Sequence, residues 1–177
     1  MNRAKLVLAA ACAASILAVS PVAAQDAPGG TASAPAEGLR YFAGDWRVSS
    51  RDPRTGETEA MRYRVEPVLD GTWFAGAGSS DKPGFQARDM WGRDQATGDI
   101  IRVIFDGSGA FVVMRSPGWK GDTLVLEGDS SHLKGNTPLR QTITRLGPRE
   151  FRAVWESKRE GVWTAYADER VTRPTAA

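Results

Sequence analysis

The feature of this sequence that most restricts its fold is a series of short runs in which apolar and polar residues alternate. Alternation with a period of two predicts β-strands with one buried face, and the runs are rich in the β-branched and aromatic residues that favour strands. About ten runs fit this pattern, and they cover residues 46–50, 58–66, 72–79, 85–91, 100–105, 110–115, 123–127, 139–145, 151–157 and 163–171. After the N-terminal apolar stretch, only residues 38–43 favour a helical turn. The pattern predicts an all-β protein.

The segments between these runs are rich in turn residues. Two of them, 51–57 and 93–99, share the order Arg-Asp, two variable residues, Thr-Gly and an acid. Asp accepts hydrogen bonds from the backbone of a turn, and Gly adopts the positive φ that a tight reversal needs. Hairpin after hairpin predicts an antiparallel up-and-down barrel of about ten strands, since closure removes exposed sheet edges. The interior of such a barrel is filled by side chains or holds a small ligand.

The N-terminal segment has the parts of a secretory signal peptide. Arg3 and Lys5 precede an apolar run at 6–19, and small residues follow at 22–24. We therefore expect cleavage after residue 24 and a periplasmic or secreted protein. Lipid attachment at Cys12 is the rival interpretation. Residues 25–37 lack large apolar side chains and are expected to be a disordered leader, which places the barrel domain at 38–173 and a short tail at 174–177.

Charge and cysteine content exclude several classes of function. Removing Arg3 and Lys5 with the signal peptide leaves 21 basic residues against 21 acidic ones. A neutral chain argues against binding to nucleic acid and to anionic membranes, which both require clustered cations. The single cysteine, Cys12, would be removed as well, so no disulfide is expected. His132 is the only histidine, and we expect neither a metal site nor a cofactor.

The opening of the first strand resembles that of a known superfamily. Gly44-Asp45-Trp46 follows the expected helical turn, and this placement of Gly-x-Trp is similar to that in lipocalins and their relatives, the calycins. The resemblance implies a lipocalin-like or fatty-acid-binding-protein-like barrel, in which the tryptophan closes one end and an arginine from the last strand packs across it. The matching arginine is Arg170 or Arg173, with Arg170 taken as the barrel-closing partner of Trp46. A cation over an indole stabilises by about 0.5–2 kcal/mol.

Two further resemblances concern bacterial barrels. Residues 42–46, 116–128, 140–143 and 161–170 are similar to a family of exported bacterial barrel domains of unknown function, which implies a fold but no chemistry. The opening also resembles nitrobindin-like haem barrels, which bind iron through a histidine near the C-terminus. No histidine follows His132, so the sequence departs from that pattern.

Candidate ligand-binding residues come from the aromatic and basic positions. Trp91 and Trp155 fill the core or line a cavity, and Trp119, flanked by glycines, is expected at the barrel rim as a lid or a contact surface. Fatty-acid-binding barrels anchor an anionic head group with an inward Arg and Tyr, and this resemblance implies Arg140 and Tyr166 here. The alternative is that the strand arginines face solvent. An inward arginine would need a carboxylate, from the protein or from a ligand.

Three functions remain open from the sequence. The leading hypothesis is a non-enzymatic binding module for a small apolar or anionic amphipathic ligand. The second is a solid structural domain that contacts proteins through exposed loops around Trp119. The third is an enzyme on a lipocalin-like barrel, which a cavity carboxylate with a strongly raised pKa would favour.

Overall fold

The computed structural model describes residues 38–81, 84–132 and 135–175 of the 177-residue chain. The expected signal peptide and leader, at 1–24 and 25–37, lie outside these residues. Within the described ranges, no helix has the length and apolar character needed to cross a membrane.

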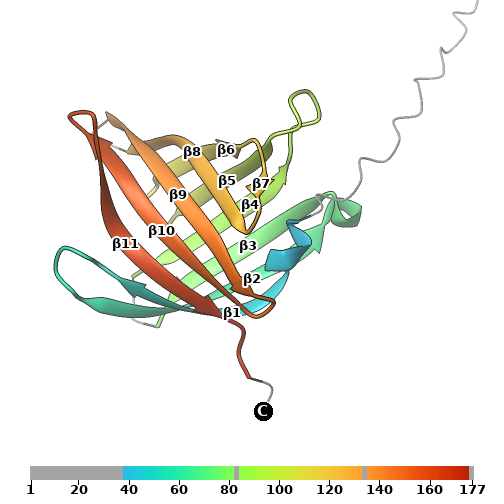
Figure 1. Cartoon of the computed structure of the whole chain (residues 1–177), viewed down its shortest axis with the longest axis horizontal. Coiled ribbons are helices and arrows are strands. Elements are labelled where there is room, and N and C mark those ends of the chain that lie inside the picture. Colours follow the sequence, from blue (N-terminus) through green and yellow to red (C-terminus); the bar gives the residue numbers. More distant parts are fainter. Residues whose placement is uncertain (1–37, 82–83, 133–134, 176–177) are drawn as a thin grey trace, which may run out of the picture. The chain divides into compact units, whose positions relative to one another are not determined.

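The described residues form an antiparallel sheet closed into a barrel of ten strands (Figure 1). Apart from β6 and β7, sequential strands are neighbours; β1 pairs with β11, and β6 pairs with both β5 and β8. The two-residue β7 is an extra strand, and it pairs with β8 alone. The strands are β1 (Gly44–Arg51), β2 (Thr58–Val68), β3 (Trp73–Ser80), β4 (Gln86–Arg93), β5 (Ile100–Asp106), β6 (Phe111–Ser116), β7 (Trp119–Lys120), β8 (Thr123–His132), β9 (Gly135–Gly147), β10 (Glu150–Arg159) and β11 (Val162–Thr172). The predicted all-β up-and-down barrel is confirmed.

The repeated turn sequence forms the same hairpin twice, once between β1 and β2 and once between β4 and β5. The N–H of Gly56 donates to the carbonyl oxygen of Asp52 at 2.8 Å, and that of Gly98 donates to Asp94 at 2.7 Å. Both glycines have φ of 78°. In each turn the Asp carboxylate also accepts a backbone N–H two residues on. The sequence pattern that the two segments share therefore gives the same turn twice.

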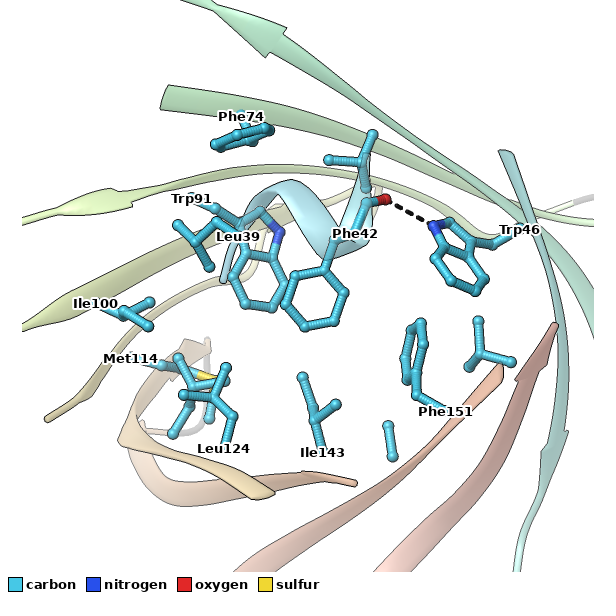
Figure 2. Packing of buried hydrophobic residues seen from close by; sticks show 14 of the residues in the cluster. Leu39, Phe42, Trp46, Phe74, Trp91, Ile100, Met114, Leu124, Ile143 and Phe151 are labelled. Carbon is cyan, nitrogen blue, oxygen red and sulfur yellow. Dashed lines mark hydrogen bonds between the residues drawn. The ribbon is translucent and has the colours of Figure 1, made fainter. Parts of the chain in front are cut away.

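One end of the barrel is closed by η1 (Arg40–Phe42), the short helical turn predicted before the first strand. Figure 2 shows the ring of Phe42 pointing into the barrel beside Trp91, with Phe151 between Phe42 and Trp46. The rings of Phe42 and Trp91 stack with centroids 5.0 Å apart, and those of Trp46 and Phe151 meet edge to face at 4.9 Å. Because these rings are buried, this end of the barrel is a packed core.

The structure explains the Gly-x-Trp sequence at residues 44–46, which lies at the end of the barrel that η1 closes. The indole Nε1 of Trp46 donates to the carbonyl oxygen of Phe42 at 2.6 Å, which ties β1 to η1 (Figure 2). Gly44 has φ of 111°, and a Cβ there would lie 2.5 Å from Nη1 of Arg173. The glycine therefore makes room for the arginine that covers Trp46.

The arginine over Trp46 is Arg173, and the assignment of Arg170 to that place is corrected. The Cζ of Arg173 lies 4.0 Å from the centre of the Trp46 ring, and its Nη2 donates to the carbonyl oxygen of Tyr41 at 3.0 Å. Arg170 is exposed and forms an ion pair with Glu150. The reason is strand register, since side chains alternate between the two faces of β11 and Arg170 points outward beside the inward Val171.

Candidate functional site

The barrel is hollow above its packed end. A cavity of about 380 Å³ lies among the inward side chains of the strands, with Phe42 and Phe151 at its closed end. Phe85, which is 44% exposed beside the β3–β4 connection, also lines it, so the cavity reaches the surface there. Much of its wall is apolar, with side chains that include Val48, Met61, Ile104, Val112, Leu139 and Ile143. The expectation of a solid barrel, which belonged to the protein-contact hypothesis, is not met.

A buried ion pair crosses the cavity wall between β4 and β5. The Nε and Nη2 atoms of Arg102 both donate to Oδ2 of Asp89, at 2.8 and 2.5 Å. Nη1 of Arg102 donates to Oε1 of Gln141, on β9, at 2.6 Å. Asp89, Arg102 and Gln141 are 4, 8 and 3% exposed. The charge of Asp89 raises the pKa of Arg102 although burial acts in the opposite direction, so the arginine is a cation whose charge is already matched.

Tyr63 and Gly76 complete this polar cluster. The hydroxyl of Tyr63 donates to the Asp89 carboxylate at 2.8 Å and accepts the indole N–H of Trp91 at 2.9 Å. Burial is the main reason that the pKa of Tyr63 is raised well above its usual value. A Cβ on Gly76 would overlap Oδ1 of Asp89 and lie 2.6 Å from the Tyr63 hydroxyl oxygen. The absence of a side chain at Gly76 therefore makes room for the Asp89 carboxylate inside the barrel.

Aromatic faces surround the Arg102 guanidinium. Its Cζ lies 4.1 Å from the centre of the Trp91 ring, 5.5 Å from that of Trp155 and 6.0 Å from that of Tyr63. These contacts favour the cation in a site where water is excluded. The cluster presents aromatic surface to the cavity, and its charges neutralise each other.

A second acid, Glu169 on β11, lines the cavity. The pKa of Glu169 is raised from 4.5 to about 7, and burial is the main cause. A hydrogen bond from Trp155 and the charge of Arg102 act in the opposite direction, while the charge of Asp168 adds a smaller increase. Glu169 is half-buried, and it faces the cavity. Arg102 is close enough to influence its pKa, yet among the described residues Glu169 forms no ion pair. A cavity carboxylate with a strongly raised pKa is the feature that the enzyme hypothesis requires.

Tyr166 enters the cavity through a β-bulge. Trp155 of β10 pairs with Ala167, while the next residue, Glu156, pairs with Ala165, so Tyr166 is the extra residue. A bulge re-aims the side chain that it inserts. Tyr166 lines the cavity with Ala167 and Glu169, and burial raises the pKa of its hydroxyl.

Three of the five predicted ligand-binding residues meet in the cavity, namely Trp91, Trp155 and Tyr166. The predicted anion anchor does not assemble, because Arg140 lies elsewhere. Its guanidinium donates to Glu156 at 2.7 and 2.9 Å and lies 4.5 Å from the centre of the Trp163 ring. Arg140 alternates with the inward Leu139 and Gln141, so its side chain points away from the barrel interior.

Trp119 is also absent from the cavity wall. It is half-buried at the closed end, where its ring stacks on Phe42 at 5.8 Å and meets Tyr41 edge to face at 6.2 Å. The Cζ of Arg145 lies 3.6 Å from the centre of its ring. Trp119 therefore packs at the closed end beneath an arginine and is not a lid over the cavity.

The residues that sequence reasoning missed are the polar ones on the inner face: Tyr63, Asp89, Arg102, Gln141 and Glu169. Arg102 was among several strand arginines whose direction depended on register. The requirement that an inward arginine have a carboxylate partner is met by Asp89. His132 lies at the end of β8, and among the residues that the structure describes no three His, Cys, Asp or Glu side chains cluster in a way that would hold a metal ion.

Comparisons with known proteins identify no family for this chain. No protein-family model matches the sequence. No curated protein matches it either. Among solved structures, a redesigned β-barrel is 13% identical, with a TM-score of 0.39, and the alignment covers 80% of this chain and 96% of that one. The structure of EF1p2_mFAP2b bound to DFHBI is 12% identical, with a TM-score of 0.42, covering 80% of this chain and all of that one.

Proposed function

We propose that this protein is a binding module that holds a small apolar or amphipathic ligand inside its barrel and does not transform it. The cavity carries this proposal. Its volume of about 380 Å³ falls in the range of about 300–1,000 Å³ that small-molecule sites occupy. Apolar walls with a few convergent polar groups are the usual lining of such sites, and here Tyr166, Gln141 and Glu169 supply the polar groups.

The lipocalin-like relationship is part of the same proposal. Gly44 and Trp46 at the start of β1, with Arg173 after β11 covering the indole, support it. The arginine that was expected to anchor an anionic ligand, in contrast, is not available inside the cavity. Arg140 lies outside the cavity, and the Arg102 charge is already matched by Asp89. We therefore expect a ligand whose polar group is not an anion.

A neutral fluorescent probe tests the binding function. N-phenyl-1-naphthylamine, which becomes bright in apolar surroundings, should bind with one site per protein. Val112→Phe, which places extra bulk in the cavity, should weaken this binding about 5- to 150-fold, as expected from a steric cost of roughly 1–3 kcal/mol. The matched control is Val113→Phe on the outer face of the same strand, which should leave binding unchanged. Equal effects of the two variants, or no binding at all, would refute the proposal.

Export is a separate proposal that rests on the N-terminal sequence. We expect the signal peptide to be cleaved after Ala24 and the mature chain to begin at Gln25. Cell fractionation of a bacterial culture that expresses the full chain, followed by N-terminal sequencing, tests it. A cytoplasmic protein that retains residues 1–24 would contradict it.

An acid–base enzyme is a second candidate, and Glu169 is the observation that favours it. A carboxyl with a pKa of about 7 is matched to proton transfer at neutral pH, and Tyr166 lines the same cavity. In that case Glu169 would take a proton from the bound molecule or return one to it. Deuterium exchange into a recovered cavity ligand, lost in Glu169→Gln, would establish this function in place of simple binding.

A further inference from the structure

Three arginines and three acids line the cavity, and they differ in how they are paired. Arg102 and Asp89 neutralise each other deep in the wall. Arg62 pairs with Asp81, Arg88 is exposed, and the Asp106 carboxylate accepts hydrogen bonds from Ser108 in its own turn. Glu169 faces the cavity from β11, and no described cation forms an ion pair with it.

Glu169 lies deep enough in the barrel for its charge to act on a ligand in the cavity. Glu169 is the next inward residue above Val171, whose side chain is buried in the packed end, and it pairs across the sheet with Ala153 and Ser50. A carboxylate held this far inside, with Trp155 as its hydrogen-bond donor, is incompletely solvated. Such a group gains more from a cationic partner than an exposed carboxylate does.

The surroundings of Glu169 also suit a cation. Trp155 on β10 and the bulged Tyr166 on β11 line the same part of the barrel and present aromatic surface. Aromatic faces attract ammonium groups, most strongly where water is excluded. Arg102 opposes a second cation, but Asp89 accepts two of its hydrogen bonds and offsets its charge.

Building on the proposed binding function, we propose that the ligand carries a protonated amine on an apolar skeleton, and that Glu169 binds this amine between Trp155 and Tyr166. The apolar part then lies against Ile104, Val112 and Leu139. Carboxylic acids are disfavoured at this position because Glu169 repels them and the nearby Arg102 is already paired with Asp89.

The proposal has a pH dependence with a definite sign. Burial raises the pKa of Glu169 to about 7, so the carboxylate that the amine needs is lost as the pH falls below that value. The ionisable and charged groups that face this region are Arg102 on β5, Asp89 on β4, Tyr63 on β2, and Tyr166 and Asp168 on β11 itself. The burial that raises the pKa of both tyrosines keeps them neutral throughout, so Glu169 is the group expected to titrate.

The experiment compares three ligands with the same chain and different head groups. Octylamine, 1-octanol and octanoate are each titrated against N-phenyl-1-naphthylamine bound to the full-length protein, at pH 8 and at pH 5.5, and displacement of the probe is measured. At pH 8 we expect octylamine to bind about 10- to 100-fold more tightly than octanol, as a charge-assisted hydrogen bond provides, and octanoate to bind more weakly than octanol. At pH 5.5 the advantage of octylamine over octanol should fall by roughly an order of magnitude, because most of the Glu169 carboxyl is then protonated.

Glu169→Gln should abolish the preference for octylamine and retain octanol binding, which also shows that the variant is folded. Glu127→Gln, on the exposed outer face of β8, is the matched control and should behave as the wild type does. If octanol binds and octanoate equals or exceeds octylamine, or if Glu169→Gln keeps the preference, the amine proposal is overturned while the binding function stands. If the probe and all three ligands fail to bind, the binding function itself is overturned.

Discussion

Removing the carboxylate of Asp89 should destabilise the barrel more than the loss of any exposed ion pair. Asp89→Asn keeps the shape of the side chain and leaves the Arg102 guanidinium buried without its counter-charge. Asp89 accepts two hydrogen bonds from Arg102 and one from Tyr63, and breaking a buried pair of this kind costs about 3–5 kcal/mol. Gln141 still accepts a bond from Nη1, and the new amide oxygen can accept another, so we expect the lower part of that range.

The assay is equilibrium unfolding in urea, with the m-value as a check that the unfolded state is unchanged. A loss of about 3 kcal/mol is a large fraction of the roughly 5–15 kcal/mol that folded domains possess. The matched control is Asp168→Asn, which breaks an exposed pair with Arg152 that has two hydrogen bonds of 2.8 Å. That variant should lose no more than about 1 kcal/mol. Equal losses for the two variants would refute the view that Asp89 and Arg102 form a buried, mutually dependent pair.

Three further perturbations have definite signs. Gly76→Ala should destabilise the protein in urea by about 2 kcal/mol or more and weaken probe binding, because the new methyl group overlaps the Asp89 carboxylate; unchanged unfolding would contradict this. Arg173→Met should lower the free energy of unfolding by about 1–2 kcal/mol because it uncovers the buried indole of Trp46, whereas Arg170→Met should lower it by less than about 1 kcal/mol. The reverse order would count against Arg173 as the arginine that covers Trp46. Glu169→Gln should become more stable relative to wild type as the pH rises from 4 to 8, by up to roughly 3 kcal/mol in urea unfolding. In the wild type, the Glu169 carboxyl has a pKa raised from 4.5 to about 7, so between these values the folded state holds a proton that the unfolded state releases. A difference in unfolding free energy between variant and wild type that does not change with pH would exclude the burial of this acid.

The fold could be predicted from the sequence because its signals are local. Alternation along each strand and the turn chemistry of 51–57 and 93–99 depend on a few neighbouring residues, and the structure reproduces both. The two-residue β7 escaped prediction because so short a strand carries no alternation. The choice between Arg170 and Arg173 also failed, since it depends on which face of β11 meets Trp46.

The polar part of the site could not be predicted because it depends on register. Arg102 and Arg140 are equivalent in the sequence, each lying within an alternating strand, yet one is buried and the other faces outward. Tyr166 is directed inward by a bulge, which shifts the phase of β11 without any sequence signal. Gly76 was the available clue, because a glycine inside a strand often marks the close approach of another group. Here that group is Asp89.

Methyl NMR during a titration with 1-octanol tests most directly whether the barrel interior receives a ligand. The cavity is lined by methyl groups of Ile104, Val112 and Leu139, while those of Val113 and Leu146 are exposed on the outer face. We expect saturable shifts confined to the inward methyl groups, with one binding constant for all three. Shifts confined to the outward methyl groups, or none up to the solubility limit of octanol, would contradict a ligand-binding barrel.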